Sequence, residues 1–384
     1  MQRNLLTLAR AFLARGLEVE VYAVDVRGPT RQALPPRVHI ERLRPGLAPG
    51  SALGLPPLAE AGTGVRPPAT ALLRAPSVLR AVPALAEVLR RRMPDALLAL
   101  GTQCNLAALL ARRRSGHRLQ LVVSEHNPLS AVVAHARNPF RRLYPELIRR
   151  SYPEAEGVVA VSEAVRRDLI ELAGLPAGRI RLVSNPMDLE EIERRSGEPL
   201  SHPIAAGDGP LILGVGRLHW QKGFRLLIAG FALLRARRPC RLVILGDGPE
   251  RGRLERAVRR LGLEGAVALP GHEPNPWRWM RRAALFVQCS QSEGFGHALV
   301  EALACGTSVV ALACPGATSE ILACGRFGRV VRERSPAALA AAMASALERP
   351  LPSRLLVARA REVAGSRAVD AYLELLTGGL HVRA

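Results

Sequence analysis

Short apolar runs alternate along this chain with longer segments in which apolar residues recur at helical spacing. Runs such as LLAL, LVV, LVIL and VVAL are long enough for buried strands. The segments between them, for example 4–16, 104–116, 224–237 and 296–306, place apolar residues on one face of a helix. Repeated strand–helix units of this length predict an α/β fold, in which helices cover both faces of parallel sheets.

The strand–helix alternation occurs in two series, and a segment rich in Pro, Gly and Ser separates them. This segment, SGEPLSHPIAAGDGP at residues 196–210, has the composition of a linker between domains. We therefore expect a doubly wound, Rossmann-like domain over 1–195 and a second one over 211–355. A last amphipathic helix within 356–384 is expected beyond the second domain. Because doubly wound domains bind ligands at the carboxyl ends of their strands, the expected site is a cleft between the two domains.

The first domain begins at a helix, whereas a doubly wound domain usually opens with a strand and a Gly-rich turn. We expect that a segment encoding this strand precedes Met1. The alternative is a fold that lacks its first strand.

Composition and charge narrow the classes of function. Hydrophobic residues make up 48% of the 384 residues, which is ample for two buried cores, and the net charge is +21. Such a charge suits nucleic acid, an anionic membrane surface or phosphorylated ligands. The basic runs, Arg112–Arg114 and Arg259–Arg260, lie in Ala/Leu-rich helices without aromatic residues, so we interpret them as solvated helix faces rather than a nucleic-acid site.

Cysteines and apolar stretches indicate a protein of the reducing cytoplasm. The six cysteines form no CxxC pair and have no histidine partner at metal spacing, so neither a disulfide framework nor a metal site is expected. The longest apolar stretch, ALLALGTQCNLAALLA, is interrupted by polar residues and is not expected to span a bilayer.

The only lysine of the chain, Lys222, lies in a Gly-bearing loop that follows the apolar run LILGV. Gly216 lets the backbone approach a ligand closely, and Arg217 stands five residues before Lys222. Two cations in a loop after a strand suit a diphosphate, because arginine binds two oxygens with its fork and lysine provides a compact point charge. A chance surface lysine is the alternative.

A second group of candidates lies in SEGFGHALVEALACG, where Glu293 and Glu301 are eight residues apart. The intervening Gly294, Phe295 and Gly296 precede a helix, whose free amide groups favour an anion or the polar edge of a sugar. Carboxylates accept hydrogen bonds from paired hydroxyl groups, as on ribose or a hexose. The alternative is a glutamate at a helix start and a second glutamate on the surface.

Further polar residues follow other strands and are candidates for the same site. They are His126 and Asn127 after LVVSE, Asn185 after RLV, and Gly316 and Glu320 after VVALA. Ser162, after VVAV, is expected to cap a helix. The chain has no GxSxG elbow and no DxD, and it shows no GxGxxG after its first strand.

Together, GVGRLHWQKG, VILGDGPERGRLE and SEGFGHALVEALACGTSVVA resemble the retaining GT-B glycosyltransferases of family 4, over about residues 5–375. The paired glutamates match that family's EX7E motif. The resemblance implies that Arg217 and Lys222 hold the donor diphosphate, that Glu301 binds the ribose hydroxyls and that Glu293 faces the donor sugar. It further implies amide contacts from residues 294–296, a base-binding turn at Gly271 and His272, and His126 near the donor sugar. The final helix, within 356–384, resembles the one that crosses back to the first domain in that family.

The chemistry implied by this resemblance is metal-independent sugar transfer with retention, from a nucleotide-diphosphate sugar and without a further cofactor. EHNP, SNPMD and GRLHWQKGF resemble members that build cell-surface polysaccharide or lipid-linked oligosaccharide, which suggests a glycan or lipid-linked acceptor at the inner face of the membrane. The basic surface would then dock on anionic lipid, and nucleic acid is not expected as a partner. The alternative is a nucleotide-sugar-binding protein whose catalysis is impaired by the missing first strand.

Overall fold

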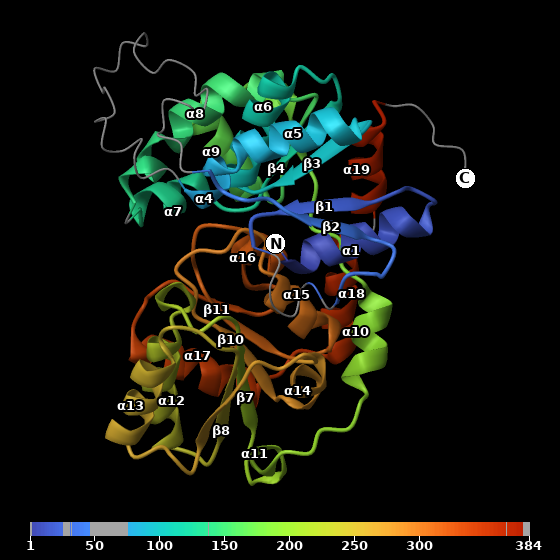
Figure 1. The fold of residues 1–384 in the computed structure, drawn as a ribbon. Helices are drawn as coiled ribbons and strands as arrows, with labels where there is room; N and C mark the ends of the chain where they lie inside the picture. The colour runs from blue at the N-terminus through green and yellow to red at the C-terminus, as the bar shows by residue number, and fades with distance from the viewer. Residues whose placement is uncertain are drawn as a thin grey trace. The chain divides into compact units, whose positions relative to one another are not determined.

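The computed structural model of the chain describes residues 2–25, 31, 33–46, 76–136, 138–365 and 367–378 (Figure 1). These residues form two compact units. Unit 1 comprises residues 1–187 together with 365–384, and unit 2 comprises residues 188–364.

The described strands of unit 1 form two parallel sheets. The first is a pair, β1 (Glu20–Ala23) and β2 (His39–Arg42), in which Val21 lies opposite Ile40. The second has four strands in the order β3-β4-β5-β6. Its members are β3 (Ala96–Leu100), β4 (Gln120–Glu125), β5 (Gly157–Ala160) and β6 (Ile180–Leu182).

The core of unit 1 joins the two ends of the described chain. Leu8 and Phe12 of α1 (Gln2–Ala14) and Tyr372 of α19 (Ala368–Leu376) pack with Val122 of β4 and Val159 of β5. The helices between the strands are α4 (Ser77–Arg80), α5 (Val82–Arg92), α6 (Thr102–Ser115), α7 (Leu129–Ala134), α8 (Tyr144–Ser151) and α9 (Glu163–Glu171). The terminal helix α19 is therefore an integral part of the core of unit 1.

Unit 2 contains one parallel sheet with the strand order β12-β11-β10-β7-β8-β9. The strands are β7 (Leu211–Val215), β8 (Arg241–Leu245), β9 (Val267–Gly271), β10 (Leu285–Gln288), β11 (Val309–Leu312) and β12 (Arg329–Val331). The chain builds outward from β7 to β9 and then returns to start β10 on the other side of β7. The boundary between β7 and β10 is thus the switch point at which doubly wound sheets bind ligands.

Two helical layers cover this sheet. On one side lie α12 (Phe224–Arg235), α13 (Arg251–Arg260) and α17 (Pro336–Glu348), and on the other lie α10 (Leu189–Ser196), α14 (Trp277–Arg282), α15 (His297–Ala304) and α18 (Ser353–Val363) (Figure 1). Phe231 and Met343 from the first layer pack on Ile212 and Leu285 of the sheet. Burial of these side chains contributes about 1.5–3 kcal/mol for each residue and fixes the strand ends that carry the site loops.

The observed units divide the chain at positions other than the expected ones. Helix α10 packs against α14 and α15, so unit 2 begins at Asp188 and includes the expected linker 196–210, which itself contains the short helix α11 (Pro203–Ala206). The expected single helix within 356–384 is two helices, of which α18 packs on α15 in unit 2 and α19 packs in unit 1. The chain therefore re-enters unit 1 at Gly365.

Local sequence signals account for several element ends. Gly16 follows α1 with a φ of 78°, and the Ser162 hydroxyl caps α9 by accepting a hydrogen bond from the Val165 amide. The basic run at the end of α6 is partly neutralised, because Arg112 lies 2.6 Å from Glu156 and Arg113 pairs with Glu154. In the part of the chain that the structure describes, none of the helices is sufficiently long and apolar to cross a membrane.

Candidate functional site

The two loops with the strongest sequence signals follow the adjacent strands β7 and β10. Lys222 lies in the loop after β7, and Glu293 lies in the loop after β10. These strands pair in parallel, with Ile212 opposite Leu285, so their carboxyl ends and loops meet at the switch point of the sheet. Sequence positions 71 residues apart are brought together in this way.

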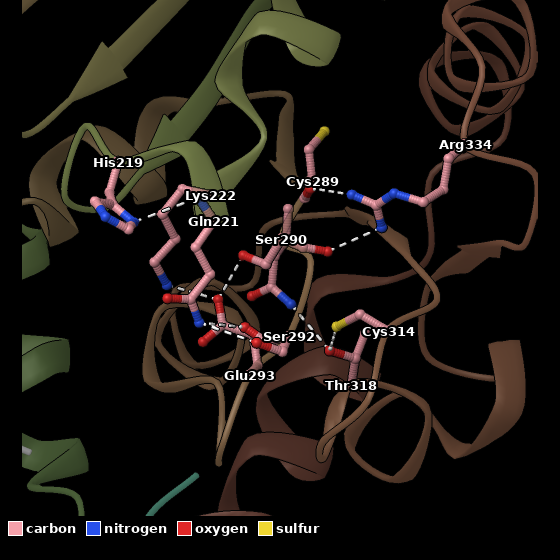
Figure 2. A network of polar contacts seen from close by, with 11 residues as sticks. His219, Gln221, Lys222, Cys289, Ser290, Ser292, Glu293, Cys314, Thr318 and Arg334 are labelled. Atoms are coloured by element: carbon pink, nitrogen blue, oxygen red, sulfur yellow. Dashed lines mark hydrogen bonds and ion pairs between the residues drawn. The ribbon is translucent and has the colours of Figure 1, made fainter. Parts of the chain in front are cut away.

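Lys222 and Glu293 form an ion pair (Figure 2). The Lys222 Nζ donates to Glu293 Oε1 over 2.6 Å, and the Ser290 hydroxyl donates to the same oxygen over 2.6 Å. The two side chains retain 27% and 12% of their exposure, so the pair is accessible to a ligand but partly shielded from water. A cation and an acid of this kind provide recognition for both a phosphate and a hydroxyl group.

Gln221 joins the loops after β7 and β10. Its side-chain Nε2 donates to the backbone carbonyl and the hydroxyl oxygen of Ser292, over 3.1 and 3.0 Å. The backbone carbonyl of Gln221 accepts a hydrogen bond from the backbone amide of Gln291. His219 Nδ1 accepts from the Gln221 amide and shapes the turn before Lys222 (Figure 2). These contacts connect the loop that carries Lys222 to the loop that carries Glu293.

Close backbone approaches at two glycines bring a third loop into the site. A Cβ at Gly223 would lie 2.1 Å from the carbonyl oxygen of Cys289, and a Cβ at Gly316 would lie 1.4 Å from that of Glu293. The Glu293 amide also donates to the carbonyl of Pro315 over 2.9 Å. The loop after β11 therefore packs against the backbone of Glu293. Gly316, which the sequence predicted as a site residue, lies directly against that backbone.

Arg334, which follows β12, supports the same loop from another side. Its guanidinium donates to the carbonyl oxygens of Ser290 and Cys289 over 3.0 and 2.9 Å (Figure 2). The sequence did not predict a role for Arg334, nor for Gln221 and Ser292. Their contacts are to backbone or to neighbouring loops, and no spacing in the sequence distinguishes Arg334 from the other arginines.

The remaining candidates of unit 2 surround this pair to differing degrees. Gly216 lies against the Lys222 stem, since a Cβ there would be 3.3 Å from Lys222 Cδ and Cε. Gly294, Phe295 and Gly296 are buried and precede α15, whose second turn carries the buried Glu301. Arg217 is exposed and makes none of the ion pairs found among the described residues.

Three candidates lie further along the same edge of the sheet. Gly271 ends β9 and His272, which follows it, is exposed, two strands away from β7. Glu320 is exposed on α16 (Thr318–Ile321), and its carbonyl accepts a hydrogen bond from Arg359. The structure places all three on loops or helices at carboxyl strand ends.

The candidates of unit 1 follow β4 and β6. Glu125 is buried at the end of β4, where its carboxylate accepts from Thr102 Oγ1 over 2.8 Å and from the Tyr152 hydroxyl over 2.9 Å. Burial raises the pKa of this carboxyl. His126 is buried, Asn127 is exposed, and Asn185 is buried after β6. A buried carboxylate thus anchors the turn that carries His126.

His126 is expected to make stability depend on pH. Burial lowers the pKa of His126 to about 3, whereas an unfolded histidine titrates near 6.5. Between these values the unfolded chain binds one more proton, so the free energy of unfolding falls as the pH decreases through this window. We expect His126→Asn to remove about 2 kcal/mol of the decrease between pH 7 and pH 5. Denaturant unfolding of both proteins at the two pH values measures the difference, and equal decreases would contradict it.

Two further features of the described residues bear on the site. Among the described residues, no group of three or more His, Cys, Asp or Glu side chains could hold a metal ion. A cavity of about 730 Å³ lies beside the amino ends of β10 and β11, and its lining includes Glu193, Arg281, Cys305 and Arg361. None of the predicted site residues lines this cavity, and we place the site at the opposite, carboxyl edge of the sheet because the candidate side chains gather there.

Two family models match the chain over most of its length. The model described as "Glycosyltransferase Family 4" matches residues 1–191, and the model described as "Glycosyl transferases group 1" matches residues 202–363. The two matches meet near the observed boundary between the units and cover both the His126 turn and the Lys222–Glu293 pair.

Individual proteins that resemble the chain agree with these two family matches. The N-acetylgalactosamine-N,N'-diacetylbacillosaminyl-diphospho-undecaprenol 4-alpha-N-acetylgalactosaminyltransferase of Campylobacter jejuni is 33% identical over 228 residues, 59% of this chain. The match spans 60% of that relative's length. Solved structures match nearly the whole chain. For Anabaena HepE in complex with UDP the TM-score is 0.69 at 20% identity, covering 98% of this chain and 96% of that one. For sucrose-phosphate synthase of Thermosynechococcus elongatus the TM-score is 0.74 at 20% identity, covering 97% of this chain and 92% of that one. These likenesses confirm the predicted fold class of two parallel α/β domains.

Proposed function

Because the chain belongs to the family 4 glycosyltransferases of GT-B architecture, we propose that it transfers a sugar with retention from a nucleotide-sugar donor to a glycan or lipid-linked acceptor. The observation that carries this proposal is the contact of Lys222 with Glu293 at the switch point of the unit 2 sheet. A nucleotide-diphosphate sugar presents phosphate oxygens and sugar hydroxyl groups side by side. The ion pair offers a matching cation and acceptor side by side.

Each part of the donor has a proposed partner on unit 2. Lys222 and the exposed Arg217 hold the diphosphate and stabilise the charge that develops on the leaving nucleoside diphosphate. Glu293 accepts hydrogen bonds from the donor sugar, and Glu301 accepts them from the ribose. The amide groups of residues 294–296 face the sugar or phosphate at the amino end of α15, where the helix leaves amide groups unpaired.

The proposed reaction proceeds on one face of the anomeric carbon. The acceptor hydroxyl oxygen forms the new bond to the anomeric carbon while the bond between that carbon and the donor phosphate oxygen breaks. The leaving phosphate oxygen accepts the hydroxyl proton, so the products are a glycoside of unchanged anomeric configuration and a nucleoside diphosphate. The protein's part is to orient the reactants and to stabilise the leaving phosphate through Lys222 and Arg217.

The proposed acceptor is a polyprenyl-diphosphate-linked sugar or a growing glycan. The Campylobacter relative acts, by its name, on a diphospho-undecaprenol-linked sugar, and this favours a lipid-linked acceptor here. The net charge of +21 favours approach to an anionic membrane surface, where each Arg close to the lipid contributes about 1 kcal/mol. No observation on the described residues favours the alternative of a binding protein without transfer activity.

A donor panel tests the proposal. The full chain is incubated with UDP-, GDP-, ADP- and CMP-linked sugars and a short-chain polyprenyl-diphosphate sugar, and nucleotide release and glycoside formation are measured. We expect acceptor-dependent release with one nucleoside diphosphate and an anomeric configuration that matches the donor. Glu301→Ala is expected to abolish transfer while the fold is retained, whereas nucleotide binding without acceptor-dependent release would instead support the binding protein.

Association with a membrane is measured separately. The chain is expected to sediment with vesicles that contain about 30% phosphatidylglycerol and not with purely zwitterionic vesicles, and raising the salt to about 0.5 M is expected to release it because exposed charges are then screened. Equal binding to both vesicle types would contradict electrostatic docking, and binding to duplex DNA of comparable salt dependence would favour a nucleic-acid partner instead.

A further inference from the structure

A chain of buried hydrogen bonds connects the terminal helix α19 to His126. The Tyr372 hydroxyl lies 2.8 Å from Ser124 Oγ, and Ser124 Oγ lies 3.1 Å from His126 Nε2. Tyr372 is on α19, whereas Ser124 is on β4 and precedes His126 by two residues. Tyr372 is thus connected to the site histidine through Ser124, although Tyr372 and Ser124 are 248 positions apart in the chain.

The three groups are isolated from water. The relative exposure of Tyr372 and Ser124 is 0%, and that of His126 is 7%. A buried polar group that loses its partner costs about 1–3 kcal/mol, so each group in the chain depends on its neighbour. The ring of Tyr372 also packs in the core of unit 1 with Val122 and Val159, which fixes the position of its hydroxyl.

The chemistry of the groups indicates the direction of the chain. Burial raises the pKa of Tyr372 to about 12 and lowers that of His126 to about 3, so the phenol keeps its proton and the imidazole is neutral. A phenol is the stronger donor of the two hydroxyls and a neutral imidazole nitrogen the stronger acceptor. These properties favour donation from Tyr372 to Ser124 and from Ser124 to His126 Nε2, which leaves the remaining ring proton on Nδ1.

We propose that Tyr372 and Ser124 are positioning residues that fix the ring and the tautomer of His126, so that the ring proton on Nδ1 is available to a sugar hydroxyl oxygen of a substrate. This inference rests on the proposed function, in which the substrates are sugars. It assigns the terminal helix, which lies far from the site in sequence, a defined part in the reaction. Tyr372 acts on the substrate only through His126 and is therefore not itself a catalytic residue.

The first experiment is a double-mutant cycle. Tyr372→Phe keeps the ring in the core and removes the hydroxyl, and we expect kcat/KM for transfer to fall about five- to tenfold, as for one lost hydrogen bond. In the His126→Ala background the same change is expected to have no further effect, because the group that it positions is absent. Additive losses would overturn the proposal, since they would show that Tyr372 acts independently of His126.

Tyr144→Phe is the matched control. Tyr144 is also a fully buried tyrosine of unit 1, and its hydroxyl is bonded neither to Ser124 nor to His126 among the described contacts. We expect this variant to transfer sugar at the wild-type rate. If Tyr144→Phe and Tyr372→Phe reduce kcat/KM equally at equal thermal stability, the loss comes from general core packing and the proposal is wrong.

The second experiment does not depend on activity. In protein labelled with ¹⁵N-histidine, the ring nitrogens of His126 are assigned by comparison with His126→Asn, and we expect the shift pattern of a neutral ring protonated at Nδ1. Tyr372→Phe is expected to shift the ring toward a mixture of tautomers. An unchanged pattern, or an Nε2–H ring in the wild type, would overturn the inference. A protein that shows the expected pattern but no transfer would instead contradict the proposed function.

Discussion

Lys222→Ala is expected to lower the kcat of sugar transfer by about 10²–10³-fold, the typical loss when one group that stabilises developing charge is removed. The charge that develops on the leaving diphosphate would then depend on Arg217 alone. Because Glu293 Oε1 keeps its hydrogen bond from Ser290, the loop after β10 is expected to remain in place. The Lys222 side chain is 27% exposed, so the free energy of unfolding should change by no more than about 1 kcal/mol.

Lys222→Arg keeps the positive charge of the side chain and changes its shape. The lysine stem runs along the backbone of Gly216, where even a Cβ would approach its Cδ to 3.3 Å. A guanidinium is broader than an ammonium group, so we expect Lys222→Arg to recover less than a tenth of the lost rate. Steady-state kinetics and calorimetric titration with the nucleoside diphosphate measure the two effects, and wild-type turnover in either variant would remove Lys222 from the site. This shape requirement would also explain why a chain that otherwise uses only arginine retains one lysine.

Strand and helix positions could be predicted where the pattern was strong. The apolar runs at 211–215, 241–245, 285–288 and 309–312 are all strands, because such runs can be buried only between two helical layers. The helix α17 was not predicted, because PAALAAAMASALE is almost entirely apolar and shows no polar face. The strand β12 has three residues, which is too short for a recognisable pattern.

Domain boundaries depend on packing that the local sequence does not contain. Residues 196–210 have a linker composition, yet Asn275 of unit 2 holds this region by donating to the Arg195 carbonyl and to Glu198. The preceding helix α10 consequently belongs to unit 2. Composition reports local flexibility, whereas the boundary is set by where long-range contacts stop.

The site could be predicted as far as strand ends and residue types allow. Polar residues after β7 and β10 were expected to meet because parallel strands end at one edge, and Lys222 and Glu293 do so at 2.6 Å. The roles of Gln221 and Arg334 could not be predicted, because both act through hydrogen bonds to other loops. The connection from Tyr372 to His126 is likewise invisible in the sequence, where α19 is simply an amphipathic helix.

Gly316→Ala is expected to reduce the rate of sugar transfer by about 10²-fold or more, although Gly316 has no side chain that could contact a substrate. An added Cβ would lie 1.4 Å from the Glu293 carbonyl oxygen and 2.5 Å from its carbonyl carbon. No rotation of a side chain relieves this overlap, because both partners are backbone. Either the loop after β11 or Glu293 must move by an ångström or more, and a displacement of this size can cost about 10²-fold in rate.

Gly325→Ala is the matched control for the backbone strain. Gly325 has a φ of 112°, close to the 123° of Gly316, and a Cβ there would meet nothing within 4 Å. Both variants should lower the melting temperature, because a side chain rarely adopts this conformation. Only Gly316→Ala should also lose transfer, since only its Cβ displaces Glu293 away from Lys222. If both variants retained the same fraction of activity at equal stability, the position of the Glu293 backbone would not govern the reaction, and the roles assigned to this ion pair would have to be withdrawn.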